Sequence, residues 1–571
     1  MSPLHDLAAR FALAVQHHQA GRLAEAERLY RAVLAAEPNH AGALNLLGVI
    51  AAQSGHGDAA VALIGRAIRL DGGNAGYHVN LGLAEQRRGH SDVAEASYRR
   101  ALDLESGNSD AHNNLGILLQ NQGSYDAAAE HFERCLAAQP DHAEALINLT
   151  LARRNQGRLD EAIACGRRAL ALRPNASEAH NNLALALDNI GRVDEALGHY
   201  GQALALKPDY AEALNNLGLS LYHAGRPEAA LDAFDRALSL RGAYGEAQLN
   251  QAMVRLSTGD FRRGWAQYET RWQTGQMAHE RRHPDLPLWD GSAGAGRTIL
   301  LWAEQGMGDT LQFCRYAPLL AERGWRVVLE VQAPLVRLLG RLAGVATVLP
   351  LGATATADCH APLMSLPLLF GTMLETIPAP TPYLAPAPEH VERWGKRLAA
   401  AGLGGQGLRV GLVWAGNPRR HAPLLALTDA RRSIALDALA PLLAVPGTRF
   451  VSLQKDLRPG EVPAAYGLLD LMDEVEDFAD TAALIAQLDL VIAVDTSTLH
   501  LAGAMGKPVW LLNRFDTCWR WLRQRDDSPW YPTLRQFRQK ALGEWSPVLA
   551  ASVEALHRLA GPDQSGRDGA I

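Results

Sequence analysis

The sequence predicts a helical solenoid followed by an α/β region of two lobes, each built on a parallel sheet. Two observations support this fold class. A 34-residue period runs through the first half of the chain, and short apolar runs alternate with helical patterns from Arg297 onward. Repeats of this length stack into a superhelix, whereas strands that alternate with helices form parallel sheets. The 571 residues are also too many for one core.

Three residue types carry the 34-residue period. Turn glycines recur at Gly21, Gly55, Gly89, Gly123, Gly157, Gly191, Gly225 and Gly259. Small residues follow five positions later, at Ala26, Ala60, Ala94, Ala128, Ala162, Ala196, Ala230 and Gly264. Leucines precede the turns at Leu47, Leu81, Leu115, Leu149, Leu183 and Leu217. A glycine ends the first helix of each pair at little cost, and an alanine lets two helices cross closely. The pattern resembles the tetratricopeptide repeat, and we assign about eight copies to residues 1–272.

A row of asparagines recurs on the first helix of the repeats, at Asn80, Asn114, Asn148, Asn182, Asn216 and Asn250. An amide side chain both donates and accepts, so it can bond a peptide backbone without reading its sequence. The row resembles the asparagine ladder of the O-GlcNAc transferase superhelix, which implies that it binds an acceptor peptide. The alternative is that the asparagines only tie neighbouring repeats together.

Composition narrows the functional class. The net charge of −6 is small and does not indicate binding to nucleic acid or to an anionic membrane. The five cysteines form no CxxC pair, which predicts a reducing compartment and no structural zinc. The N-terminus lacks the basic region of a signal peptide, and no apolar run is long enough to span a bilayer. We therefore expect a soluble, cytoplasmic protein.

The second half divides at two irregular stretches. Residues 273–296 predict a linker, residues 297–380 a first lobe and residues 391–560 a second lobe, with a proline-rich stretch before the second lobe. The final residues, 561–571, are small and polar and predict a disordered tail. Single helices are expected over residues 310–324 and 434–444.

The stretch AVDTSTLHLAGAMGKPVWLL has the most specific motif of the second half. A buried strand ends at Asp495, and the next residues open a helix whose free N–H groups suit a phosphate. The stretch resembles a signature of the heptosyltransferase family, whose members have the GT-B fold of two Rossmann-like lobes. The resemblance implies a donor-phosphate site at Asp495, Thr496, Ser497, Thr498 and His500. The alternatives are a helix N-cap for Asp495 and a core position for His500.

The stretch GMGDTLQF follows the first strand of the first lobe, at the sheet edge where such folds bind ligands. Gly306 and Gly308 predict a tight turn that lets the backbone approach a substrate. The stretch resembles the opening motif of the heptosyltransferases, which implies that Asp309 is the general base that takes the acceptor proton. The alternative is that Asp309 only caps the following helix.

The stretch DARRSIAL places two arginines before a serine N-cap and an apolar helix. It matches a basic position of the same family, which implies that Arg432, with Arg431 beside it, neutralises the departing phosphate. The alternative for either residue is a solvated surface charge. Asn417, Arg419, Arg420 and His421 precede this stretch, and Glu304, Gln305 and Lys455 are weaker candidates at strand ends. For the aromatic patch of Trp519, Trp521, Trp530 and Tyr531, packing between lobes is favoured over sugar stacking.

Together these resemblances imply an inverting glycosyltransferase that moves a sugar from a nucleotide-sugar to a Ser or Thr hydroxyl of a protein held by the superhelix. The architecture is similar to that of bacterial O-GlcNAc-transferase-like and flagellin-glycosylating proteins, so flagellin is one candidate acceptor. The donor sugar is a substrate, and no cofactor is expected. The second half lacks a D-x-D motif placed to hold a metal, so we expect a metal-independent reaction. Self-association into a homo-oligomer is also expected. The alternatives are a transferase acting on a glycan or lipopolysaccharide acceptor, and a non-catalytic scaffold.

Overall fold

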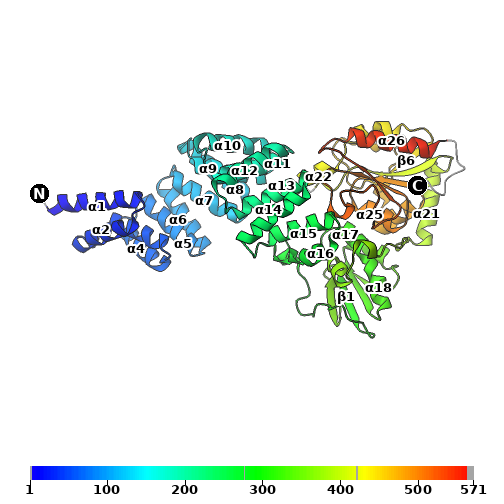
Figure 1. Cartoon of the computed structure of the whole chain (residues 1–571), viewed down its shortest axis with the longest axis horizontal. Helices are drawn as coiled ribbons and strands as arrows, with labels where there is room; N and C mark the ends of the chain where they lie inside the picture. The colour runs from blue at the N-terminus through cyan, green and yellow to red at the C-terminus, as the bar shows by residue number, and fades with distance from the viewer. Residues whose placement is uncertain (1–2, 276, 419–421, 562–571) are drawn as a thin grey trace. The chain divides into compact units, whose positions relative to one another are not determined.

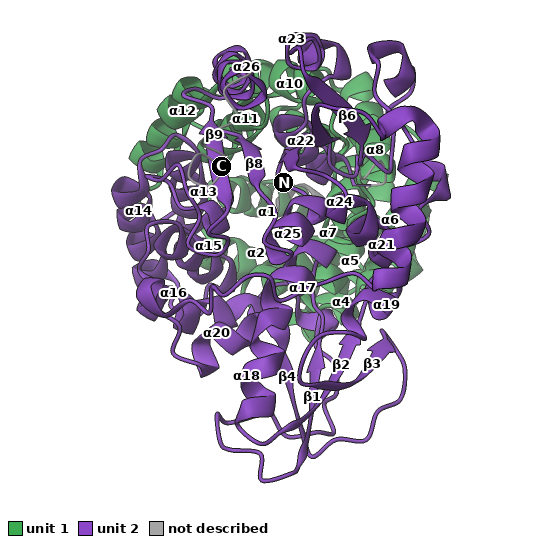
Figure 2. Cartoon of the chain, turned by 90° about the vertical axis from the view of Figure 1, so that its right-hand side faces the viewer, with its two compact units in different colours: residues 1–208 green, residues 209–571 purple. Residues whose placement is uncertain are grey.

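The computed structural model describes residues 3–275, 277–418 and 422–561. The chain divides into two compact units, residues 1–208 and 209–571, coloured separately in Figure 2. In its described residues the first unit is built of helices that pair in antiparallel hairpins (Figure 1). These helices are α1 (Pro3–Gln19), α2 (Leu23–Ala36), α3 (Ala41–Gln53), α4 (Gly57–Leu70), α5 (Ala75–Arg87), α6 (Ser91–Leu104), α7 (Ser109–Asn121), α8 (Tyr125–Ala138), α9 (Ala143–Asn155), α10 (Leu159–Leu172), α11 (Ser177–Asn189) and α12 (Val193–Leu206).

The repeat residues occupy the positions that the sequence predicts. All eight turn glycines lie in the left-handed region, with φ between 73° and 87°. The alanines of the second row, Ala26 to Ala230, are fully buried. A further glycine row on the first helices also makes room for a partner, since a Cβ at Gly116 would lie 2.6 Å from the Phe132 ring. The predicted solenoid is therefore confirmed, and small residues set how closely its helices pack.

The second unit begins with four more repeat helices, α13 (Ala211–His223), α14 (Pro227–Leu240), α15 (Gly245–Ser257) and the short α16 (Phe261–Tyr268), followed by the 3-10 turn η1 (Glu269–Gln273). These helices belong with the α/β region because their contacts lie there. The Trp265 ring of α16 packs 5.2 Å from that of Trp519. The Arg271 guanidinium, fully buried, forms an ion pair with buried Glu304 at 2.8 Å. The last repeats are therefore part of the fold that carries the two sheets.

Each lobe has one sheet in which all paired strands are parallel. The first sheet has the order β3-β2-β1-β4 and the second the order β6-β5-β7-β8-β9. The strands of the first sheet are β1 (Thr298–Trp302), β2 (Arg326–Val331), β3 (Val345–Pro350) and β4 (Cys359–Pro362), and those of the second sheet are β5 (Leu408–Val413), β6 (Thr448–Ser452), β7 (Leu490–Ala493), β8 (Val509–Asn513) and β9 (Leu534–Arg538). The predicted parallel α/β region is confirmed, although β3, β4 and β9 were not anticipated.

Two predicted helices have a different form in the structure. Residues 310–324 form α17 (Met307–Phe313), a 3-10 turn at Cys314–Tyr316 and α18 (Ala317–Glu322), and Pro318 lies at the start of α18. Residues 434–444 form a 3-10 turn at Leu436–Leu439 and the short α23 (Ala440–Leu443). In both places a proline without an N–H falls inside the predicted helix and favours a new helix start.

The remaining helices of the α/β region are α19 (Val336–Leu339), α20 (Leu366–Leu369), α21 (Pro388–Leu398), α22 (Pro423–Arg432), α24 (Phe478–Ala486), α25 (Ser497–Ala504) and α26 (Ser546–Ala560). Helices α17 and α25 contact each other between the two sheets (Figure 2). In the predicted linker, the Trp289 N–H donates to the His360 carbonyl at 2.8 Å, so this segment lies along β4. In the described part of the chain, no helix combines the length and apolar character needed to cross a bilayer.

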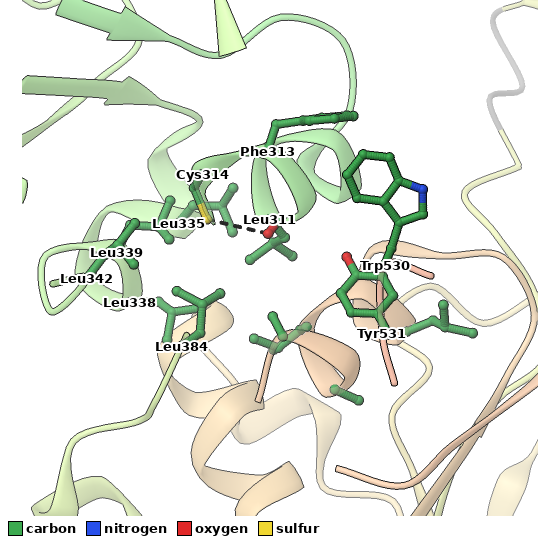
Figure 3. Packing of buried hydrophobic residues seen from close by; sticks show 14 of the residues in the cluster. Leu311, Phe313, Cys314, Leu335, Leu338, Leu339, Leu342, Leu384, Trp530 and Tyr531 are labelled. Carbon is green, nitrogen blue, oxygen red and sulfur yellow. Dashed lines mark hydrogen bonds between the residues drawn. The ribbon is translucent and has the colours of Figure 1, made fainter. Parts of the chain in front are cut away.

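The aromatic patch forms part of the core that joins the lobes. Trp521, Trp530 and Tyr531 are fully buried. Figure 3 shows Trp530 beside Phe313 of α17, and their ring centroids lie 5.6 Å apart. The prediction of a packing role for this patch is therefore confirmed.

Candidate functional site

A cavity of about 600 Å³ lies where the carboxyl ends of the two sheets meet. It is lined by residues that follow β1, β5, β6, β7 and β8. Every predicted donor-site residue contributes to its wall, as do both predicted glycines and Asp309; these residues are Gly306, Gly308, Asp309, Arg432, Asp495, Thr496, Ser497, Thr498 and His500. Open α/β sheets bind ligands at this edge, so the fold brings the predicted residues together where a ligand is expected.

Helix α25 presents its N-terminus to this cavity. Thr496 is its N-cap with extended backbone, and the Thr496 hydroxyl donates to the Val494 carbonyl at 3.2 Å. Asp495 therefore precedes the cap, and the alternative of Asp495 as the N-cap is wrong. The backbone N–H groups of Ser497 and Thr498 fall in the first turn, where no intrahelical acceptor exists. Both residues are half-buried, so these N–H groups form a small surface suited to an anion.

Arg432 reaches the same part of the cavity from the end of α22. Its Nε and Nη2 atoms each lie 2.9 Å from Asp429 Oδ1, and Nη1 donates to the Asp495 carbonyl at 3.0 Å. Three of the five guanidinium N–H bonds thus fix the side chain, and two remain for a ligand. The predicted serine N-cap is wrong. Ser433 ends α22, where its hydroxyl accepts the Gly416 N–H at 3.2 Å. The helix start that the sequence suggested is a helix end.

Gly416 is required for this position of Arg432. A Cβ atom at residue 416 would lie 2.1 Å from Asp429 Oδ1 and 2.2 Å from Arg432 Nη2. The glycine is needed here for the space that a side chain would fill. The neighbouring Asn417 also lines the cavity, whereas Arg431 pairs with Asp516 at 3.2 Å. Arg419, Arg420 and His421 lie outside the described residues.

Asp309 faces this site from the first lobe. Its Oδ2 atom accepts the Gly306 N–H at 3.0 Å, so it caps α17 as the alternative proposed. Its Oδ1 atom also forms an ion pair with Arg520 of the second lobe. Capping uses one oxygen and the arginine uses the other, while the side chain still borders the cavity. The contacts therefore combine a capping role with a position that suits proton transfer.

The two glycines before Asp309 act differently from the prediction. The left-handed residue of this turn is Gln305, with φ of 61°, and Gly306 has an ordinary φ of −87°. Gly308 lies inside α17, where a Cβ would come within 2.9 Å of the His500 ring. The prediction that both glycines form the tight turn is wrong, and Gly308 instead lets α17 and α25 approach each other.

His500 is a buried residue of the cavity wall. Burial lowers its pKa to about 4, and the nearby Arg520 acts in the same direction while Asp495 opposes it. The His500 ring stacks on Trp521 with centroids 5.1 Å apart, and Nδ1 lies 2.9 Å from the Tyr531 hydroxyl. His500 thus has the core contacts of the alternative interpretation and also lines the cavity, where a neutral ring can donate a hydrogen bond.

The weaker candidates mostly have structural contacts. Glu304 is held by Arg271, and the Gln305 amide donates to the Tyr268 hydroxyl at 3.0 Å. The Lys455 ammonium donates to the carbonyls of Met472 and Val475, at 2.9 and 2.7 Å. Of these three candidates, all within the described part of the chain, Lys455 alone lines the cavity.

The asparagine row makes contacts between neighbouring repeats. Asn80 Nδ2 donates to Asn45 Oδ1 at 3.1 Å, and Asn148 donates to Asn113 at 3.3 Å. Asn182 donates to the Ile147 carbonyl at 3.2 Å, and Asn250 to Asn215 at 3.0 Å. Each bond reaches 35 residues back, into the preceding repeat. These contacts support the alternative that the row ties repeats together, and an acceptor peptide remains a prediction.

Several charged residues of the site were not predicted from the sequence, among them the carboxylates Asp456, Glu476 and Asp477, which line the cavity. Arg514 and Arg520 line the cavity, and buried Asp429 orients Arg432. Arg514 directly follows the last residue of β8, at the sheet edge where the other site residues lie, and this position is a signal that the sequence contains. Among the described residues, no group of three or more His, Cys, Asp or Glu side chains is placed to hold a metal ion.

Comparison with known proteins identifies the repeats. Two sequence models of the tetratricopeptide repeat match residues 17–81 and residues 79–134, 114–177 and 181–247. The protein FlbA of Caulobacter vibrioides is 28% identical over 345 residues, which cover 55% of each chain, so the chain spans about half the length of this relative.

Among solved structures, the chain is similar to YrrB, a TPR protein described as having an unusual peptide-binding site. The identity is 24%, the match covers 32% of this chain and 95% of YrrB, and the TM-score is 0.28. It is also similar to MamA, with 27% identity, 28% and 93% coverage and a TM-score of 0.25.

Proposed function

We propose that the chain is a nucleotide-sugar-dependent glycosyltransferase of the inverting kind. The observation that carries this proposal is the composition of the cavity wall. Arg432 and the N-terminus of α25 come from one lobe, and Asp309 comes from the other. This arrangement supports an anion site that faces a carboxylate able to act as a base.

In the proposed reaction the nucleoside phosphate of the donor binds at α25 and Arg432. Asp309 takes the proton of an acceptor hydroxyl while the acceptor oxygen bonds to the anomeric carbon. The bond from that carbon to the phosphate oxygen breaks, and its electron pair leaves with the phosphate. Arg432 stabilises the charge that develops there. The GT-B assignment is part of this proposal, and the two parallel sheets with a cavity at their carboxyl ends support it.

Release of the nucleotide tests the proposed activity. The purified chain is incubated separately with UDP-, GDP-, ADP- and CMP-activated sugars, and free nucleotide is measured over time. We expect release from one donor class, and a loss of tenfold or more in Arg432→Ala. Arg431→Ala is the matched control, because Arg431 neighbours Arg432 but pairs with Asp516. An equal rate in wild type and Arg432→Ala would contradict the proposed phosphate site.

The acceptor is proposed to be a protein, and the tetratricopeptide repeats support this choice. Flagellin and a lipopolysaccharide core are assayed in parallel as acceptors by mass spectrometry.

If the asparagine row binds the acceptor, Ala at Asn114, Asn148 and Asn182 will abolish transfer to protein without changing donor hydrolysis. Equal loss of both reactions would contradict peptide recognition and favour the tying role that the contacts of Asn148 and Asn182 support.

A further inference from the structure

Arg520 has more hydrogen-bond donors than its described neighbours accept. Its side chain is 9% exposed and lines the cavity. Nη2 bonds Asp309, and Nη1 lies 3.1 Å from the Cys518 sulfur, which is a weak acceptor. The buried Nε has no hydrogen-bond partner among the described residues. A buried guanidinium with one strong acceptor is poorly compensated, so this site is suited to a further anion.

The Arg520 guanidinium packs against the ring of Trp519, which helps to fix its position. It lies 4.2 Å from the centre of the Trp519 ring, and Trp519 packs against Trp265 of the last repeat. Asp309 belongs to the other lobe, so the ion pair bridges the cavity. An anion that enters between the lobes can therefore meet an arginine that is already in place.

The other arginines of this wall differ from Arg520 in where their carboxylate partners lie. Two N–H groups of Arg432 bond Asp429 Oδ1. Arg514 Nε lies 3.5 Å from Asp516, although this atom, like Arg520 Nε, has no hydrogen-bond partner among the described residues. Both carboxylates belong to the same lobe as their arginines. Asp309 is the acidic partner of Arg520 among the described ion pairs, and it is also the proposed base. The Asp309 carboxylate therefore cannot pair fully with Arg520 and accept the acceptor proton at the same oxygen.

We propose that Arg520 contacts the phosphate of the donor and that Asp309 takes the phosphate's place on Arg520 before the donor binds. This inference rests on the proposed function. When the donor binds, the N–H groups of Arg520 turn to phosphate oxygens, which are strong acceptors. The Oδ1 atom of Asp309 is then released to take the acceptor proton. Donor binding thereby prepares the base, and Arg520 shares with Arg432 the charge of the leaving phosphate.

Calorimetric titration with UDP, GDP, ADP and CMP tests the exchange, because affinity is measured without turnover. We expect Arg520→Met to weaken binding by about tenfold to a hundredfold, and Arg520→Lys to restore part of it. Asp309→Asn should strengthen binding several-fold, since it removes the competitor for Arg520. In the double variant Arg520→Met/Asp309→Asn this gain should disappear. Unchanged melting temperatures would show that the variants fold.

The outcomes separate this inference from the proposed function. If the wild type binds a nucleotide but Arg520→Met binds it equally well, the exchange is overturned and the donor site stands. The exchange is also overturned if Asp309→Asn strengthens binding by the same factor with and without Arg520, because simple charge repulsion would then explain the gain. If no nucleotide binds the wild type, both proposals fail.

Discussion

In both the repeat array and the cavity wall, glycines leave space that a neighbouring side chain fills. In the repeats this space is filled by a recurring helix contact, and in the cavity wall by a contact that occurs once. In the repeats, Gly48, Gly82, Gly116 and Gly218 each lie against a large side chain of the paired helix. In the cavity wall, Gly416 leaves space for the contact between Asp429 and Arg432. A contact that recurs is one of several that hold the array together, whereas a contact that occurs once has no substitute. Single substitutions should therefore have larger effects in the α/β region.

The largest loss of stability is expected for Glu304→Ala. This change removes one of the two carboxylates that pair with the buried Arg271 guanidinium and leaves Glu269 as the other. The loss should therefore lie near the lower end of the about 3–5 kcal/mol that breaking a buried ion pair costs. The measurement is the free energy of unfolding from a urea titration followed by tryptophan fluorescence. Glu392→Ala is the control, because its pair with Lys396 is exposed and should have little effect. Similar stabilities for the two variants would contradict the importance of the single-copy contact.

The second effect concerns binding. Gly416→Ala forces apart Asp429 and Arg432, so nucleotide affinity should fall about as far as in Arg432→Ala, by roughly tenfold to a hundredfold. Isothermal titration with the nucleotide that the wild type binds measures this loss. Gly198→Ala is the matched control, because a Cβ atom at residue 198 would have no neighbouring atom within 4 Å. Wild-type affinity in Gly416→Ala would show that Arg432 does not hold the ligand.

The third effect tests a recurring contact. Gly116→Ala places a methyl group 2.6 Å from the Phe132 ring, and such overpacking costs about 1–3 kcal/mol. The melting temperature should fall, while nucleotide affinity should stay at the wild-type value. Gly198→Ala again serves for comparison, and it should be slightly stabilising in an exposed helix. A loss of affinity in Gly116→Ala would remove the distinction between the two regions.

The smallest expected effect is a pH dependence of the first unit. His112 and His131 approach with their Nδ1 atoms 2.9 Å apart, and His180 and His199 repeat this geometry. Burial, and then the neighbouring His112, lower the pKa of His131 to about 4, below its ordinary value of 6.5. The neutral form is therefore stabilised by folding, and this stability is complete above pH 6.5 and is lost as the pH falls toward 4.

The change should be on the order of 1 kcal/mol after allowance for the partial exposure of these rings. Unfolding of residues 1–208 is measured between pH 7 and pH 4 in the full chain, by hydrogen exchange. In His131→Gln the dependence should be shallower, because one titrating ring is absent. An identical slope in this variant would show that the pair does not titrate as described.

The same contrast explains what could be predicted from the sequence. The repeats were predictable because each contact is local and recurs every 34 residues, as the φ values of the turn glycines show. The site residues at the edge of the cavity were predictable because the sequence motifs that contain Asp309 and Asp495 follow closely after strands β1 and β7. The pair of Asp309 and Arg520 spans 211 residues and the two lobes, so no local pattern indicates it. Ser433 was assigned to the wrong end of a helix because an apolar run followed it.

A thermal-shift titration with UDP, GDP, ADP and CMP, on wild type and Arg432→Ala, tests most directly whether the cavity is a nucleotide site. A ligand that binds only the folded chain raises its melting temperature. We expect a concentration-dependent rise with one of these nucleotides in the wild type, and little or no rise in the variant. No shift with any nucleotide would contradict a nucleotide site in this cavity and would leave the repeats as the functional part of the chain.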